Sequence, residues 1–306
     1  MKTRFYYDLG QARSVMLALL FMVCGAGFVS CGSDDDEEGG GGSTNLPTID
    51  ANEQIASIYD SDNDIIFNYK DGVMTGGQIV EGGSFTITSS GIVYEEGGSD
   101  ELYRETYTIK KRNSFGAVTS ADVKCVEVGY GEQYTGNGTM TASYDSDNHL
   151  TSMNFSVSDG DFSESIKFTF TWSGGNLLKA VYEYVEEEYG YVYKDEETYV
   201  YEYGSDAVSN SGVYIPGFLT DMEYICYSGL LGRPTKNIPT SIDGYEVTVN
   251  LDSHDRVMDL YIGGYKYASY AYNSGANDVL PSPRKAASAD RKHSVIRRMF
   301  SALRAR

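Results

Sequence analysis

A strand–turn–strand pattern recurs along this chain, and it limits the possible fold more than any other feature. Aromatic-rich segments are separated by short turns of Asp, Asn, Ser and Gly within residues 67–74, 144–150, 172–177 and 251–257. These turn residues tolerate the left-handed backbone that tight hairpins require. Successive hairpins of this kind build an antiparallel meander, so the pattern predicts an all-β chain.

Alternation within the segments supports the same prediction. Between residues 166 and 172, apolar side chains (Ile166, Phe168, Phe170, Trp172) alternate with polar ones (Lys167, Thr169, Thr171). A period of two is typical of a half-buried strand. Because the hairpins are unevenly spaced, a regular propeller or solenoid repeat is excluded. We expect further strands at residues 84–88, 102–110, 118–128, 181–185, 191–193, 198–203, 245–250 and 265–272.

One stretch departs from the strand pattern. Apolar residues between 217 and 230 have helical spacing, namely Phe218, Leu219, Met222, Ile225, Cys226 and Leu230. The following Gly232-Arg233-Pro234 would end a helix. The sequence therefore predicts one short helix near 217–230, packed over the end of a curled sheet.

The first thirty residues have the order of an export signal. Basic residues precede an apolar run from Val15 to Val29, which ends at Ser30-Cys31. This order predicts a lipoprotein signal peptide over 1–30, with acylation of Cys31 after cleavage. An ordinary secretory peptide with an incidental cysteine is the alternative. Cys24 is a poorer acylation site because Met22 and Val23 precede it.

Residues 31–49 are expected to form a flexible tether. Five acidic residues at 34–38 are followed by four glycines at 39–42, a composition that cannot bury a core. The acidic run resembles the surface-export signal of lipoproteins in some gut-dwelling Gram-negative bacteria. This resemblance implies an outward-facing position on the outer membrane. A solvated spacer facing the periplasm is the alternative.

Charge is strongly asymmetric along the chain. The whole sequence has a formal net charge of −20, which excludes a nucleic-acid partner because phosphate contacts need basic patches. Residues 284–306 instead hold eight basic residues against Asp290, a net +7. Val295, Ile296, Met299, Phe300 and Leu303 would share one helical face there. This tail, 281–306, could lie on anionic lipid, dock on its own acidic barrel or be a frayed extension.

Two segments of the chain resemble those of a known family. One is the Tyr-Asp-Ser-Asp-Asn-His-Leu hairpin at 144–150, and the other is Tyr227-Ser228-Gly229-Leu230-Leu231-Gly232-Arg233-Pro234-Thr235-Lys236-Asn237-Ile238-Pro239. Over about residues 50–275, the chain resembles secreted bacterial lipoproteins with a domain of unknown function described as having a porin-like fold. The resemblance implies a β-meander domain at 50–280, closed or nearly closed like a barrel, with no assigned activity. Acidic residues crowd the expected strand ends, so we predict a soluble barrel rather than a membrane-spanning one.

Tyrosine rows are the candidate binding residues. One row holds Tyr189, Tyr191 and Tyr193, and another holds Tyr199, Tyr201 and Tyr203. Flat rings in a row could stack on sugar rings, with nearby carboxylates accepting hydroxyl protons. The alternative is a half-buried strand face whose phenols reach water.

The remaining candidates are weaker. Asp60, Asp62 and Asp64 alternate as calcium ligands would, but Ile65 replaces the glycine that such loops need. Cys125 and Cys226 could form a disulfide in an oxidising compartment. His149 and His254 occupy equivalent hairpin turns, which indicates turn chemistry. The sequence contains no motif for a catalytic triad, a zinc site or a phosphate loop, so we predict no catalytic residue, no metal and no cofactor.

These patterns favour a non-enzymatic surface lipoprotein, anchored by lipid in the outer membrane, that binds a glycan or an envelope protein. An enzyme that acts on polysaccharide through a carboxylate pair remains an alternative, because such pairs are defined only by their separation in space. A structural envelope component is the third.

Overall fold

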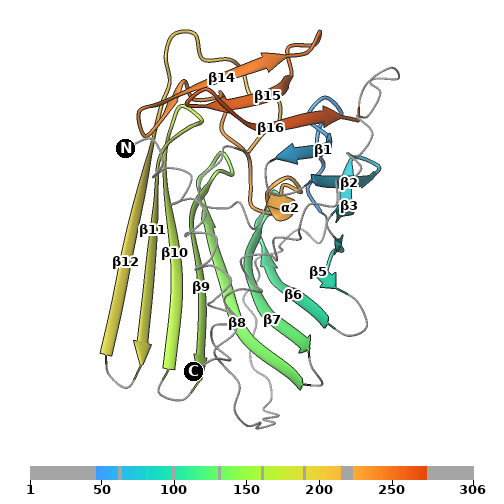
Figure 1. Cartoon of the computed structure of the whole chain (residues 1–306), viewed down its shortest axis with the longest axis vertical. Helices are drawn as coiled ribbons and strands as arrows, with labels where there is room; N and C mark the ends of the chain where they lie inside the picture. Colours follow the sequence, from blue (N-terminus) through green and yellow to red (C-terminus); the bar gives the residue numbers. More distant parts are fainter. Residues whose placement is uncertain are drawn as a thin grey trace.

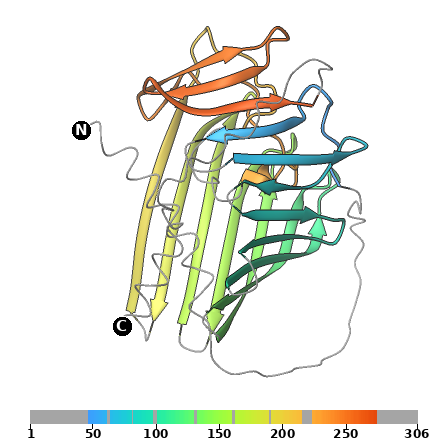
Figure 2. The same ribbon diagram turned by 45° about the vertical axis from the view of Figure 1, so that its right-hand side comes forward.

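Antiparallel pairing between β1 (Ile55–Asp60) and β16 (Tyr265–Tyr272) closes the sheet into a barrel. The computed structural model describes residues 46–60, 64–80, 82–97, 101–129, 132–159, 162–188, 191–214 and 223–273. Within these ranges, sixteen strands each pair antiparallel with their neighbours in the sequence. The predicted β-meander is therefore confirmed, and the barrel is closed (Figures 1 and 2).

The strands fall into a long set and a short set. The long set is β6 (Glu101–Arg112), β7 (Val118–Gly129), β8 (Glu132–Tyr144), β9 (Leu150–Asp159), β10 (Phe162–Ser173), β11 (Asn176–Glu188) and β12 (Tyr191–Glu202). Besides β1 and β16, the short set is β2 (Asp64–Lys70), β3 (Val73–Ile79), β4 (Gly83–Ile87), β5 (Gly91–Gly97), β13 (Ser241–Ile242), β14 (Tyr245–Leu251) and β15 (Val257–Ile262).

This difference in length makes the barrel lopsided. A strand of twelve residues spans about 40 Å, whereas one of six spans about 20 Å. Figure 1 shows the long strands as one tall wall, with β14–β16 crossing its upper end. The lower part of the wall, including the N-terminal start of β12, therefore extends beyond the short strands (Figure 2).

Tight turns connect the predicted hairpins as expected. Asp71 and Gly72 both have positive φ, as do Gly174 and Gly175, and so do Asn148 and Asp255 in the other two turns. Such φ values match the right-handed twist of the flanking strands. The four predicted hairpins are confirmed as β2–β3, β8–β9, β10–β11 and β14–β15.

Apolar side chains fill the barrel interior. In β10, Ile166 and Phe168 are each 1% exposed, whereas Lys167 between them is exposed, so the predicted alternation is confirmed. The outer face carries cross-strand ion pairs, such as Lys110–Asp122 at 2.8 Å and Lys167–Glu183 at 2.9 Å. A membrane-spanning barrel would instead present an apolar band outward. The outer wall of this barrel therefore suits water.

Among the described residues, no helix has the length and apolar character needed to cross a membrane.

The connection between β12 and β13 enters the barrel and fills it. Its residues 223–240, here called the plug, include α2 (Glu223–Cys226) and the segment that carries the family resemblance. Leu230 and Leu231 of the plug are 0% and 1% exposed. Plug backbone also bonds to the wall, since Val118 N donates to Leu230 O at 2.8 Å. In Figures 1 and 2, α2 lies between the long wall and the short strands.

The predicted short helix is confirmed as α2, a helix of four residues followed by turns up to residue 231, while 215–222 lie outside the described residues. Gly229 and Gly232 both have positive φ, which ends helical geometry there. One strand prediction was wrong: β12 was predicted as two strands, 191–193 and 198–203, and is one continuous strand.

Candidate functional site

Four tyrosines of the two predicted rows lie on one face of a single strand, β12. Side chains alternate along β12, so Tyr191, Tyr193, Tyr199 and Tyr201 point the same way. Tyr199 and Tyr201 are only 6% and 3% exposed, and burial raises the pKa of Tyr201 well above its usual range. These two rings are part of the core and cannot stack on a sugar.

Tyr203 is also structural. Its hydroxyl donates to Leu177 O at 2.9 Å and lies 3.0 Å from Thr235 Oγ1 of the plug. Burial raises the pKa of Tyr203 to about 12. Tyr189 lies outside the described residues. Of the five predicted rings that the structure describes, two therefore stay candidates.

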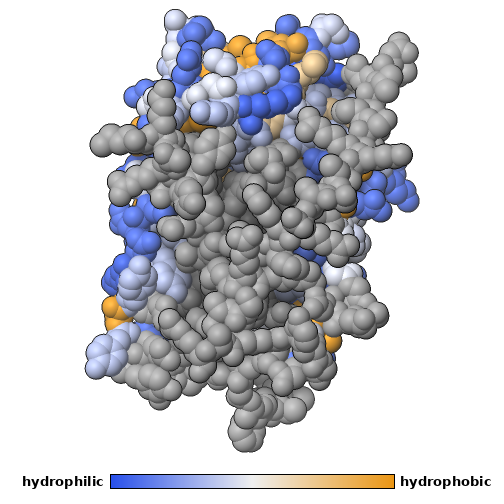
Figure 3. All heavy atoms as spheres, in the orientation of Figure 1, coloured by the Kyte–Doolittle hydropathy of each residue, from blue (hydrophilic) through white to orange (hydrophobic). Residues whose placement is uncertain are grey.

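Tyr191 and Tyr193 are those candidates, at the far end of β12. They are 83% and 58% exposed, and Val192 between them is 55% exposed on the opposite face. Two residues apart on one face, the two tyrosines have Cα atoms separated by about 7 Å. The Tyr193 ring meets the buried Tyr184 ring edge-on, with centroids 5.9 Å apart. Figure 3 shows the edge of the molecule where β12 lies as mostly hydrophilic, with an apolar patch near its lower end.

This end of β12 is also an edge of the sheet. On one side, residues 191–196 pair with β11. On the other side, β13 pairs only with Tyr201 and Glu202, and no further strand of the described ranges lies against 191–196. The exposed Lys194, Asp195 and Glu196 stand along this edge. Charged side chains at a sheet edge discourage pairing with another strand.

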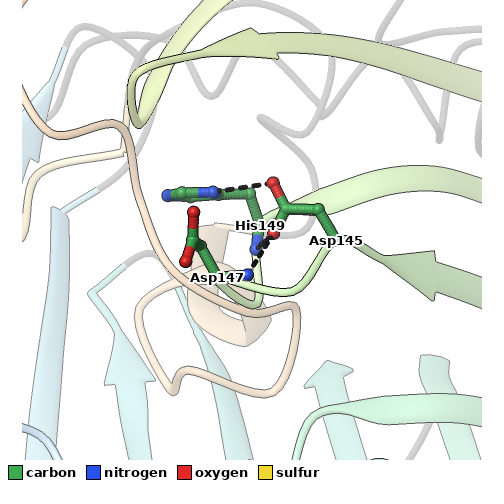
Figure 4. Close-up of side chains that lie close together, drawn as sticks. All are labelled: Asp145, Asp147 and His149. Carbon is green, nitrogen blue, oxygen red and sulfur yellow. Dashed lines mark hydrogen bonds and ion pairs between the residues drawn. The ribbon is translucent and has the colours of Figure 1, made fainter.

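A second candidate is the cluster of Asp145, Asp147 and His149 in the β8–β9 turn (Figure 4). Their possible ligand atoms lie within 4.8 Å of one another. However, Asp145 Oδ1 accepts the backbone N–H groups of Asp147 and His149, both at 2.9 Å, and Oδ2 hydrogen-bonds with His149 Nδ1 at 3.0 Å. Burial alone would raise the pKa of Asp145, but the hydrogen bonds from His149 and Asp147 outweigh it and hold this pKa low.

The β14–β15 turn repeats this geometry with different residues. Asp252 Oδ1 accepts the backbone N–H groups of His254 and Arg256 at 2.8 and 2.9 Å, and Oδ2 accepts from Arg256 Nε at 2.7 Å. Burial would raise the pKa of Asp252, but the bonds from Arg256 and His254 lower it.

Arg256 therefore takes the position of His149, and each stacks on an aromatic ring. The guanidinium lies 4.5 Å above Tyr272, and the imidazole lies 4.4 Å from Trp172. An arginine cannot ligate a metal, so the shared geometry is that of a turn. The two hairpins are equivalent as predicted, but His149 and His254 are not: His254 takes the position of Asp147.

Glu105 in β6 forms a buried polar cluster that sequence reasoning missed. Its side chain is in the interior, where Tyr107 Oη donates to Oε1 at 2.9 Å and Tyr224 Oη, from the plug, donates to Oε2 at 3.1 Å. Burial raises the pKa of Glu105, although these two hydrogen bonds oppose the rise. The missed signal was an acidic residue at an inward position of an alternating strand, between Tyr103 and Tyr107.

The predicted disulfide is absent. Cys125 and Cys226 are both buried, and no disulfide joins them. The Cys125 thiol instead faces Glu105 Oε1 at 4.0 Å, and burial raises its pKa far above the usual range. Such a thiol is a weak nucleophile. Of the calcium candidates, Asp64 begins β2, whereas Asp62 and the side chain of Asp60 lie outside the described residues.

Comparison with known proteins adds two solved structures. Comparisons with protein families and with curated proteins find no match. A porin-like protein from Bacteroides vulgatus is similar over 72% of this chain and 100% of its own, with 13% identity and a TM-score of 0.46. A porin-like protein from Bacteroides uniformis is similar over 58% and 94%, with 16% identity and a TM-score of 0.23. Since neither TM-score reaches 0.5, the barrel assignment rests on the strand pairing of this chain.

Proposed function

We propose that this chain is a non-enzymatic envelope barrel, anchored by a lipid on Cys31, which binds glycan through Tyr191 and Tyr193. The observation that carries the proposal is the 83% and 58% exposure of these two rings on one strand face. Large aromatic side chains usually bury most of their surface, so two exposed neighbours suit contact with a partner. The adjacent Asp195 is exposed and supplies a carboxylate that can accept hydroxyl protons.

The interior offers less support for a binding or catalytic role. Its side chains are packed together with the plug, and Glu105 is occupied by hydroxyl donors. A glycosidase of the usual kind requires a second carboxylate about 5–9.5 Å away. Each carboxylate oxygen of Glu105 already accepts a hydrogen bond from a tyrosine hydroxyl of the packed interior. This buried acid therefore does not support the enzyme alternative.

Glycan arrays test the binding proposal. The mature chain in detergent is compared with the double variant Tyr191→Ala/Tyr193→Ala. We expect the variant to bind at least about fivefold more weakly, because each of the two stacked rings contributes about 0.5–1.5 kcal/mol. Tyr265→Ala is the matched control, since Tyr265 is also exposed (61%) but lies on β16.

Two results would contradict the proposal. Absence of binding across host, plant and bacterial glycans would leave the structural envelope role in its place. Equal binding by the double variant and the wild type would move the site away from β12.

Metabolic labelling with an alkyne fatty acid tests the anchor separately. Cys31→Ser is expected to abolish labelling and release the protein from the membrane fraction, whereas Cys24→Ser leaves both unchanged. Outward orientation is tested by adding protease to intact cells, which should remove the barrel from the surface. Labelling that persists in Cys31→Ser would disprove the proposed anchor.

A further inference from the structure

The hairpin of β11 and β12 concentrates negative charge. Residues 183–202, here called the acidic hairpin, contain eight acidic residues and one basic residue, Lys194, a net −7. Glu183 and Glu196 are direct cross-strand partners, an arrangement that is unfavourable for two like charges. Lys167 neutralises only one of them, through its 2.9 Å ion pair with Glu183.

The end of this hairpin combines charge with apolar surface. Glu187, Asp195 and Glu196 are exposed there. Tyr191, Val192 and Tyr193 lie among them, and Tyr191 is the most exposed large apolar or aromatic side chain of the described residues. A surface of this kind suits a partner that carries both positive charge and an apolar face.

Residues 284–306 of the same chain have this chemistry. Their net charge of +7 is equal and opposite to the −7 of the acidic hairpin. Their five apolar residues would share one helical face. We propose that this basic segment docks on the acidic hairpin of its own barrel, with the apolar face on Tyr191 and Tyr193.

The connecting chain is long enough for this contact. Strand β16 ends at Tyr272, and ten residues, 274–283, separate the last described residue from the basic segment. Ten extended residues reach about 33 Å. Strand β12 is about 40 Å long. The linker and the 23-residue segment together are therefore long enough to reach the Tyr191 end of this strand.

A second copy of the chain is a poorer occupant of the same surface. Two acidic hairpins brought together would place two charges of −7 side by side, which opposes association. Intramolecular docking also benefits from a high effective concentration. Docking does not depend on glycan binding, but a docked segment would cover the proposed glycan site.

Limited trypsin digestion of the mature chain tests the docking, because the basic segment is rich in trypsin sites. The rate of cleavage after Arg297 and Arg298 is followed by mass spectrometry. The variant Glu187→Gln/Asp195→Asn/Glu196→Gln should be cleaved about fivefold faster than the wild type, since three exposed ion pairs each contribute modestly. Raising NaCl to about 0.5 M should accelerate wild-type cleavage similarly by screening.

The matched control neutralises three exposed acids elsewhere, as Asp71→Asn/Asp206→Asn/Glu246→Gln. It should be cleaved at the wild-type rate, and circular dichroism should show all three proteins folded. Carbodiimide cross-linking of the wild type should join Lys285 or Lys292 to carboxylates of 183–202 within one molecule.

Three outcomes would overturn the proposal. The first is equal cleavage of the wild type and the hairpin variant at low salt. The second is cross-linking only between molecules, shown by mixing isotope-labelled and unlabelled protein. The third is protection that arises only on adding vesicles of phosphatidylglycerol and phosphatidylcholine, which would assign the segment to a lipid surface.

Discussion

Tyr201 and Tyr193 lie on the same face of the same strand, yet one is 3% and the other 58% exposed. At the Tyr201 end, β13 pairs with β12 and the interior is filled. At the Tyr193 end, the strand extends beyond the short half of the barrel. Alternation therefore fixes the direction of a side chain, whereas the neighbouring elements decide whether that face is covered.

Replacing each tyrosine by alanine tests this contrast most directly. Tyr201→Ala should lower the free energy of unfolding by about 3–5 kcal/mol, because it leaves a cavity in the core. Tyr193→Ala should lower it by only about 0.5–1.5 kcal/mol, because the ring is largely exposed and makes an edge-on contact with Tyr184. Chemical denaturation measures both. Similar losses in the two variants would mean that the Tyr193 end of β12 is as well packed as the core.

A glycine in the plug tests whether the plug fits the wall tightly. A Cβ added to Gly232 would lie 2.3 Å from Asn148 O, and its φ is +89°, so Gly232→Ala should cost about 2–4 kcal/mol of unfolding free energy. Gly244→Ala is the matched control, with φ +78° but open space around the new Cβ. It should cost only about 1 kcal/mol from backbone strain. Equal costs would show that contact with Asn148 contributes nothing.

The buried acid predicts a pH dependence. Because burial raises the folded-state pKa of Glu105 above its ordinary value of 4.5, ionisation is opposed in the barrel. The contribution of protonated Glu105 to stability is fully present when the pH is below 4.5. It is lost as the pH rises through the folded-state pKa of Glu105. Within this window the wild type should lose about 1.4 kcal/mol per pH unit relative to Glu105→Gln. A stability difference that is constant from pH 4 to 8 would contradict the assignment.

The turn cluster gives the smallest effects. His149→Arg should be nearly neutral, within about 0.5 kcal/mol, because arginine occupies the equivalent position 256. Asp145→Ala should cost about 1–2 kcal/mol, since it leaves two backbone N–H groups without their acceptor. Adding Ca²⁺ or Zn²⁺ should not raise the melting temperature of the wild type. A rise that disappears in His149→Arg would instead reveal a metal site.

Much of the fold could be predicted from local residue patterns. Turn residues such as Asp71-Gly72 and Gly174-Gly175 located the hairpins, because positive φ restricts which residues fit. Polar residues at 194–197 concealed the continuity of β12, since both faces are exposed there and the alternation disappears. The candidate site was predictable only in part: the tyrosine rows were visible in the sequence, but their division into two exposed and three structural rings was not.

The all-β class, the hairpins and the acidic charge could be predicted from the sequence, since each depends on residues close together in the chain. The pairing of β1 with β16 and the filling of the interior by residues 223–240 became visible only in the folded barrel. The fold also brought Tyr224 to Glu105 across 119 positions. These features require contacts between distant segments, and the short-range patterns that predict strands and turns contain no information about which distant segments meet.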